Sequence, residues 1–302
     1  MSVSPQAIIN SRFGVALAMG LGGLIPPRLG HPLASKIASF ISSRKNLRMV
    51  QAVRANQWVI SQGRLSGKDL DLQTRAVFQH TAHCLYDVYR YFKKPAEFQK
   101  LIVFSARIEE IIKDSQSPGD GLLVVGVHMS NFDFVMQLAA QRGLKALALS
   151  FPNPGGGYQV QNELRRRSGV EIVPASVSSL RTAVTRLKAG KVVLTGLDRP
   201  MPHPDYRPKF FGHLSNLPVF YVQLAILAQV PIVVASAIMD ENCVYHIQAS
   251  EPIHMKEDHD KHTEILMNTE RVLEVAAGYI RQAPMQWSMT YPVWPDLMDR
   301  IP

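Results

Sequence analysis

Short apolar runs alternate with amphipathic stretches throughout residues 121–302. The apolar runs are Leu122–Val127, Ala146–Phe151, Glu171–Pro174, Val192–Leu197, Ile232–Ile238 and Val244–Ala249. Helices are expected between or after them, at Phe132–Gly143, Gln159–Ser168, Ser178–Ala189, Leu217–Gln229 and Thr263–Gln282. This alternation predicts an α/β fold in which a mainly parallel central sheet is flanked by helices on both faces.

The N-terminal part of the chain has apolar residues at helical spacing instead. Helices are expected over residues 5–25, 31–43, 46–62, 70–93 and 98–114. In the second of these, Leu33, Ile37, Phe40 and Ile41 fall on one face. The sequence SQSPGDG then ends the helical pattern. We therefore predict a helical portion, residues 1–115, followed by an α/β core, residues 116–302.

The formal net charge of +9 is concentrated at the N-terminal end. The first 68 residues hold nine basic residues and no acidic one, and Asp69 is the first acid. The remaining 24 basic residues are balanced by 24 acids. An excess of positive charge indicates an anionic partner. Because apolar residues lie between the charges, we expect an anionic membrane surface rather than nucleic acid.

The N-terminal portion is expected to lie on a membrane without crossing it. Residues 13–27 carry no charge, but these 15 residues fall short of the roughly 20 that a spanning helix needs. No signal-peptide pattern is recognisable. The two cysteines, Cys84 and Cys243, match no metal-ligand spacing and are expected to be thiols in a reducing compartment. A peripheral or monotopic protein is therefore predicted.

A histidine follows the first apolar run of the core. In GLLVVGVHMSNFD (121–133), His128 comes directly after Val127, and Asp133 stands five residues later. On a continuous helix these side chains would point about 140° apart. A turn from the strand into a helix would instead let Asp133 accept a hydrogen bond from one ring nitrogen. The other nitrogen could then take a proton from an alcohol. We predict that His128 and Asp133 form a base–orienter pair for acyl transfer to a hydroxyl of the substrate.

Other site chemistries find little support in the sequence. No GxSxG, GxxxxGK[ST] or GxGxxG motif is present, which disfavours hydrolase, P-loop and dinucleotide-binding folds. His80 and His83 are three residues apart on an expected helix, but no third metal ligand lies close in sequence. We assign both to packing or to the surface, and the chemistry requires no metal and no bound cofactor.

Six ordered motifs resemble those of the bacterial lipid A biosynthesis late acyltransferase family, within the wider lysophospholipid and glycerolipid acyltransferase group. They are HMSNFD (128–133), NELRRRSG (162–169), GKVVLTGLDRP (190–200), KFFG (209–212), VPIVVASAIM (230–239) and APMQW (283–287). Asp133 departs from the glutamate usual in the lipid A enzymes. In having aspartate at this position, the motif resembles that of glycerolipid acyltransferases and of enzymes that acylate phosphatidylinositol mannosides.

The resemblance implies a glycerol-3-phosphate acyltransferase-like fold and an O-acyltransferase activity. The donor would be an acyl thioester of coenzyme A or of acyl-carrier protein, and the acceptor a hydroxyl of a membrane lipid or glycolipid. Lysophospholipid, lipid A precursor and phosphatidylinositol mannoside all stay open as acceptors. The reaction would take place at the cytoplasmic face of the cell membrane. The alternative is a non-catalytic lipid-binding or scaffolding protein on the same fold.

The resemblance also implies roles for residues beyond His128 and Asp133. Arg165 and Arg199 would hold phosphate groups of donor or acceptor, because a guanidinium binds phosphate with two hydrogen bonds. Asp198 would orient Arg199 or a group of the donor. Phe211 and Gly212 would shape the wall of the active site.

Overall fold

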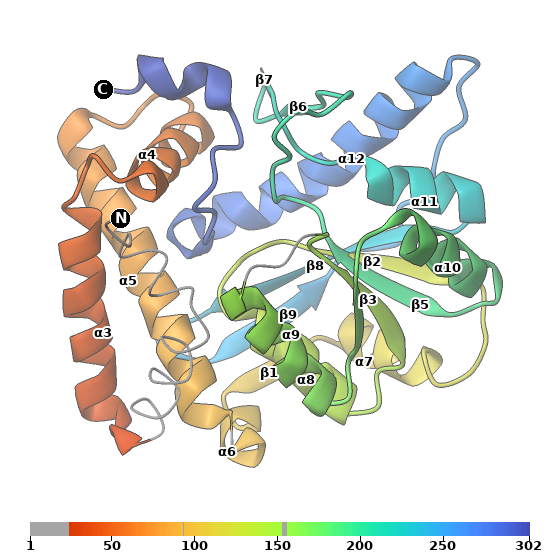
Figure 1. Ribbon diagram of the computed structural model, residues 1–302, viewed down its shortest axis with the longest axis horizontal. Helices are drawn as coiled ribbons and strands as arrows, with labels where there is room; N and C mark the ends of the chain where they lie inside the picture. The colour runs from red at the N-terminus through yellow and green to blue at the C-terminus, as the bar shows by residue number, and fades with distance from the viewer. Residues whose placement is uncertain (1–23, 93, 153–155) are drawn as a thin grey trace.

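A seven-stranded sheet is the central element of the computed structural model, which describes residues 24–92, 94–152 and 156–302 (Figure 1). Along the sheet the strand order is β1-β9-β8-β2-β5-β3-β4. Their bounds are β1 Ile102–Phe104, β2 Leu122–Gly126, β3 Ala146–Ser150, β4 Glu171–Pro174, β5 Val192–Gly196, β8 Ile232–Met239 and β9 Tyr245–Ala249. A separate hairpin is formed by β6 (Lys209–Phe210) and β7 (His213–Leu214).

The sheet is mainly parallel, which confirms the prediction from sequence. β8, β2, β5, β3 and β4 are all parallel neighbours. β9 is antiparallel to β8, and β1 is parallel to β9. The six predicted apolar runs coincide with β2, β3, β4, β5, β8 and β9 to within one residue at each end.

Helices cover both faces of the sheet (Figure 1). They are α7 Ala106–Asp114, α8 Phe132–Gln141, α9 Gly156–Arg167, α10 Val177–Lys188, α11 Phe220–Ala228 and α12 Lys261–Gln282. Successive side chains of β2 point to opposite faces. Val125 packs in the same cluster as Leu187 of α10 and Val272 of α12, whereas Val124 packs with Ile111 of α7. The near-continuous apolar strands therefore reflect burial on both sides.

The N-terminal helices stand together at one end of the sheet (Figure 1). They are α3 Pro27–Ser42, α4 Arg48–Ile60, α5 Gly67–Tyr91 and the short α6 Pro95–Gln99. α5 begins at a cap in which the Ser66 hydroxyl accepts a hydrogen bond from the Asp69 amide, at 3.2 Å. Residues 5–23 of the helix predicted over residues 5–25 lie outside the described part. Within the described residues, no helix has the length and apolar content to cross a membrane.

The predicted helix over residues 98–114 is wrong, because the structure has α6, β1 and α7 there. Ile102 and Phe104 are buried while Val103 is exposed, which is the alternation of a strand. Ser105 then caps α7, its hydroxyl accepting from the Ile108 amide at 3.4 Å. The edge strand of the sheet thus lies inside the stretch 1–115 that we expected to be helical. Two short 3₁₀ helices, η1 (Pro284–Gln286) and η2 (Pro295–Arg300), complete the fold.

Candidate active site

Two polar side chains meet at the carboxyl ends of the central strands β2 and β5. These strands are paired in parallel, with Gly126 opposite Gly196. Two residues beyond each glycine stand His128 and Asp198, so the register brings them side by side. Gly196 also leaves space for the imidazole, because a Cβ atom there would lie 3.0 Å from His128 Cε1. The carboxyl ends of parallel strands are the usual position of a ligand site in open α/β sheets.

The His128 ring is fixed by the Asp198 carboxylate. The Nδ1 atom lies 2.5 Å from Asp198 Oδ1, and the His128 backbone N–H donates to Oδ2 at 3.0 Å. The Trp287 indole N–H donates to the same Oδ2 at 2.7 Å. An ionised carboxylate only accepts hydrogen bonds, so Nδ1 carries the ring proton and Nε2 has the lone pair. His128 is therefore held in the tautomer of a general base.

Asp198 is ionised although its side chain is completely buried. Burial alone would raise the pKa of this carboxyl, because it disfavours the charged form. The His128 ring, the Trp287 N–H and the His128 backbone N–H together outweigh burial, and the pKa of Asp198 is lowered from its ordinary value. The carboxylate can thus stabilise a positive charge on the imidazole during a reaction.

The predicted pairing of His128 with Asp133 is wrong. Asp133 instead accepts a hydrogen bond from Arg165 Nε at 2.6 Å. The predicted strand–turn–helix arrangement is present, with α8 starting at Phe132. However, the ring that lies edge-on to His128 is that of Phe132, with centroids 4.5 Å apart. Successive residues of a helix point about 100° apart, so Asp133 is turned away from the imidazole towards α9.

The two arginines predicted to bind phosphate lie in different settings. Arg165 is only 4% exposed, and its Nη1 donates to Asn162 Oδ1 at 2.6 Å in addition to the Asp133 pair. Burial by itself would lower the pKa of Arg165, but Asp133 outweighs burial and raises it above its ordinary value. Arg165 is therefore engaged in a buried internal ion pair.

Arg199 lies among aromatic rings beside the site. Its guanidinium carbon is 4.3 Å from the Phe151 ring centroid and 4.5 Å from that of Tyr291, and Nη2 donates to the Tyr291 hydroxyl at 2.9 Å. Among the described residues, no carboxylate pairs with Arg199. Of the two roles predicted for Asp198, orienting Arg199 is wrong, because the Asp198 carboxylate contacts His128 and Trp287 instead.

An apolar cavity of about 670 Å³ adjoins the His128 ring. It extends between the sheet and the helices α7 and α8, and most of its lining side chains are aliphatic or aromatic. On α8 the lining positions are Phe132, Val135, Met136 and Ala139. This i, i+3, i+4, i+7 spacing forms a single helix face leading away from His128. His128, Arg165 and Arg199 are among the polar residues of the lining.

A histidine held by a buried carboxylate beside an apolar cavity is consistent with chemistry on a lipid chain, and the family comparison supports this. The model of the bacterial lipid A biosynthesis acyltransferase family matches residues 13–295. The chain belongs to this family. It is therefore an acyltransferase that acts on lipids, and the non-catalytic alternative is set aside. Comparison with curated proteins gives no match.

The APMQW motif of this acyltransferase and the next residue, Ser288, support the turn that carries His128, a role that the sequence did not reveal. The Ser288 amide donates to the His128 carbonyl at 2.9 Å, and the Ser130 amide donates to the Gln286 carbonyl at 3.0 Å. The Ser130 hydroxyl also donates to Gln286 Oε1 at 2.5 Å. Ser130 has a φ of +44°, an uncommon value outside glycine, and these bonds hold it there. Since its Trp287 also donates to Asp198, the motif contacts both members of the His128–Asp198 pair.

Phe211 and Gly212 do not line the cavity of the acyltransferase. They form the two-residue loop between β6 and β7, with φ values of +49° and +80°. Two positive φ values are typical of a type I′ hairpin turn and favour glycine. The rings of Phe210 and Phe211 pack on Trp294, at centroid distances of 5.6 and 6.2 Å. The structure thus gives the FFG motif a packing position instead of the predicted place in the active-site wall.

Proposed function

We propose that this acyltransferase moves a fatty acyl chain from a thioester of coenzyme A or acyl-carrier protein to a hydroxyl of a membrane lipid or glycolipid. The observation that carries the proposal is the His128–Asp198 pair beside an apolar cavity of about 670 Å³. The donor is a substrate, and no bound cofactor takes part. We place the reaction at the cytoplasmic face of the membrane.

The proposed reaction uses the lone pair of His128 Nε2. This atom takes the proton of the acceptor hydroxyl while the hydroxyl oxygen attacks the thioester carbon. Asp198 stabilises the imidazolium that forms. The backbone N–H groups in the first turn of α8, which begins four residues after His128, are suited to stabilise the oxyanion of the tetrahedral intermediate. Collapse of the intermediate breaks the carbon–sulfur bond, and the thiolate leaving group takes the proton from Nε2.

The cavity is the proposed binding site of the acyl chain. Its apolar lining would remove the chain from water, which contributes about 0.8 kcal/mol per buried methylene group. From Phe132 to Ala139 the lining face of α8 rises about 10 Å, so the chain would extend along this helix, away from the reacting carbon. Arg199, which has no carboxylate partner among the described residues, is placed to bind a phosphate of the donor or acceptor.

Replacing Ala139 with phenylalanine is expected to shift the donor preference towards shorter acyl chains. The new ring would occupy part of the cavity far from His128 and exclude the end of a long chain. Transfer rates measured with a series of acyl-thioester lengths would show the shift. Gln141→Phe, which adds the same ring at an exposed position of the same helix, should keep the original preference. Equal length profiles in both variants and the parent protein would place the acyl chain elsewhere.

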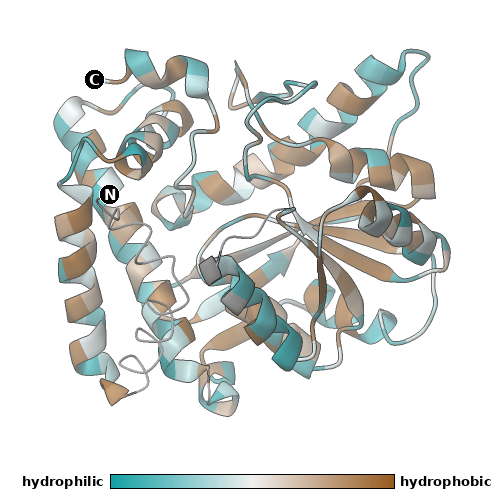
Figure 2. Ribbon diagram, in the orientation of Figure 1, coloured by the Kyte–Doolittle hydropathy of each residue, from teal (hydrophilic) through white to brown (hydrophobic). Residues whose placement is uncertain are grey.

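A second part of the proposal concerns the surface of α3, which we propose docks on an anionic membrane. Leu29, Leu33, Ile37 and Phe40 are 48–64% exposed along this helix, and apolar residues recur on it in Figure 2. The neighbouring basic residues Arg28, Lys36, Arg44 and Arg48 are exposed as well. The predicted apolar face is present except for Ile41, which packs against the core of the helical portion. An exposed apolar face bordered by basic side chains is typical of interfacial helices.

Flotation with vesicles tests this docking surface. The protein should bind vesicles containing anionic lipid, and binding should weaken as salt rises, because salt screens exposed charges. Ile37→Asp and Phe40→Asp should each reduce binding by about tenfold or more, since an Ile or Phe side chain contributes roughly 1.5–3 kcal/mol on burial. Leu227→Asp, at a 61% exposed position on α11, is the matched control and should bind normally. Equal binding to zwitterionic vesicles would contradict the electrostatic part.

A further inference from the structure

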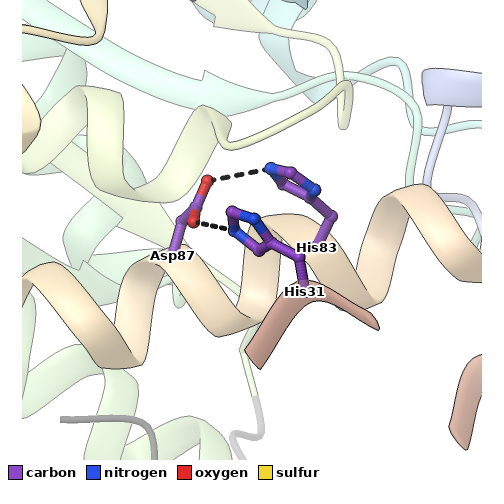
Figure 3. A group of neighbouring side chains, drawn as sticks. All are labelled: His31, His83 and Asp87. Carbon is purple, nitrogen blue, oxygen red and sulfur yellow. Dashed lines mark hydrogen bonds and ion pairs between the residues drawn. The ribbon is translucent and has the colours of Figure 1, made fainter. Parts of the chain in front are cut away.

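Two histidines and an aspartate meet where α3 packs against α5, remote in sequence from the catalytic pair (Figure 3). His31 belongs to α3, and His83 and Asp87 stand one turn apart on α5. His31 Nε2 lies 2.8 Å from Asp87 Oδ1, and His83 Nε2 lies 3.4 Å from Asp87 Oδ2. One ligand atom from each of the three residues lies within 4.8 Å of the others. The fold thus brings His31 beside His83, although the two residues are far apart in the sequence.

The hydrogen bonding of this cluster is incomplete. The Nε2 atom of His83 is buried and has no hydrogen-bond partner among the described residues. Asp87 Oδ2, 3.4 Å away, faces this nitrogen as an ion-pair contact without the geometry of a hydrogen bond, and it accepts from the Tyr245 hydroxyl at 2.6 Å. A buried ring nitrogen that makes no hydrogen bond is unusual and unfavourable.

The charge of the cluster is favourable for a cation. Asp87 is 2% exposed, and its two oxygens lie within hydrogen-bond distance of His31 Nε2, at 2.8 Å, and of the Tyr245 hydroxyl, at 2.6 Å. A carboxylate there supplies the negative charge that a divalent cation favours. Tyr245 also fixes the orientation of that carboxylate, as outer hydrogen bonds do for metal-binding side chains.

We propose that His31, His83 and Asp87 form a binding site for one divalent transition metal ion of the Zn²⁺ type. Two imidazole nitrogens and one carboxylate oxygen are a ligand set that zinc commonly takes. The His31 and His83 side chains are 27% and 18% exposed, so the cluster lies near the surface of the protein.

Binding requires a small rearrangement of the two rings. As the side chains lie, the rings are stacked, with centroids 3.8 Å apart and planes at 16°. Ligand atoms of a tetrahedral zinc site lie about 3.4 Å apart, given metal–ligand distances near 2.0–2.1 Å. Both rings would therefore rotate about their side-chain torsions until the two Nε2 lone pairs point at the ion. Each Nε2 must be unprotonated, so the affinity falls as the pH is lowered.

An ion at this position would link the exposed helix α3 to the C-terminal part of α5. The residue next to His83 is Cys84, whose carbonyl accepts a hydrogen bond from the Asn131 amide group at 3.1 Å, within the turn that follows His128. The site would therefore connect α3 rigidly to that turn. This inference does not depend on the acyl-transfer reaction or on membrane binding.

Metal titration of the full chain tests the site. Protein stripped by a chelator would be titrated with Zn²⁺ in competition with a chromophoric chelator, and with Co²⁺ followed by absorbance. We expect one equivalent of Zn²⁺ bound with submicromolar affinity, a rise in the melting temperature and the strong visible bands of tetrahedral Co²⁺. His31→Gln and His83→Gln should each weaken binding by at least tenfold and abolish the rise in melting temperature.

His246→Gln is the matched control, because His246 Nε2 lies 3.0 Å from Asp240 Oδ2 in a pair that belongs to no three-residue ligand group in the described part of the chain. This variant should bind metal like the parent protein. If His83→Gln does not fold, His31→Gln alone tests the proposal. The His31 side chain is partly exposed on α3, so we expect this variant to fold. Unchanged affinity and stoichiometry in His31→Gln, or only the weak bands of a surface-bound Co²⁺, would mean an adventitious ion only and would overturn the proposal.

Discussion

Replacing Asp198 with asparagine is expected to lower the rate of acyl transfer by about 10³- to 10⁴-fold while the protein stays folded. An asparagine can turn its amide NH₂ towards His128 Nδ1, which makes that nitrogen an acceptor. The ring proton then moves to Nε2, and the atom that should take the proton of the acceptor hydroxyl no longer has a free lone pair. The measurement is kcat with an acyl-thioester donor, together with circular dichroism to confirm the fold.

Two further variants provide reference rates for this experiment. His128→Gln removes the base and sets the lowest rate. Asp133→Asn is expected to reduce the rate far less than Asp198→Asn, because Asp133 binds Arg165 and does not touch the imidazole. A near-normal rate in Asp198→Asn, combined with a rate in Asp133→Asn as low as that of His128→Gln, would restore the pairing predicted from sequence.

Replacing Arg165 with methionine is expected to lower the free energy of unfolding by about 3 kcal/mol or more. The guanidinium is 4% exposed and its partner Asp133 is 16% exposed, so the substitution leaves a largely buried carboxylate without its counter-ion. Urea denaturation followed by fluorescence would measure the change. The double variant Asp133→Leu/Arg165→Met should recover most of the stability, because it removes both charges together.

The adjacent Arg166 provides a matched control. It is exposed and lies 3.7 Å from Glu163, so Arg166→Met should change stability by no more than about 0.5 kcal/mol. If Arg165→Met were as stable as the parent protein but bound phosphate-bearing donors more weakly, the assignment of Arg165 to an internal ion pair would be wrong. The role implied by the family resemblance, phosphate binding, would then apply.

The hydrophobic pattern was sufficient to predict most of the sheet, because strands buried on both faces appear as continuous apolar runs. β1 was not predicted, since its three residues lie between helical segments and are strand only through pairing with β9. Pairing with a distant strand determines the secondary structure of such short segments, and the local spacing of apolar residues does not reveal that pairing.

The His128–Asp198 contact could not be predicted from local sequence either. Asp133 was chosen because it is close to His128 in sequence, whereas the true partner, Asp198, lies 70 residues away. That contact follows from the register of β2 against β5, which a single sequence does not specify. His31 and Asp87, 56 residues apart on two helices, could not be connected for the same reason. The motif containing Asp198 was recognised, but its role required the geometry.

The contacts of Trp287 and Ser288 also set the time at which activity can appear during protein synthesis. These residues follow all seven strands of the sheet along the chain, yet they hold Asp198 and the turn of His128. A nascent chain whose sheet strands have all left the ribosome would still lack the indole that positions Asp198. We therefore expect acyl transfer to begin only after Trp287 and Ser288 have left the ribosome and packed against the sheet.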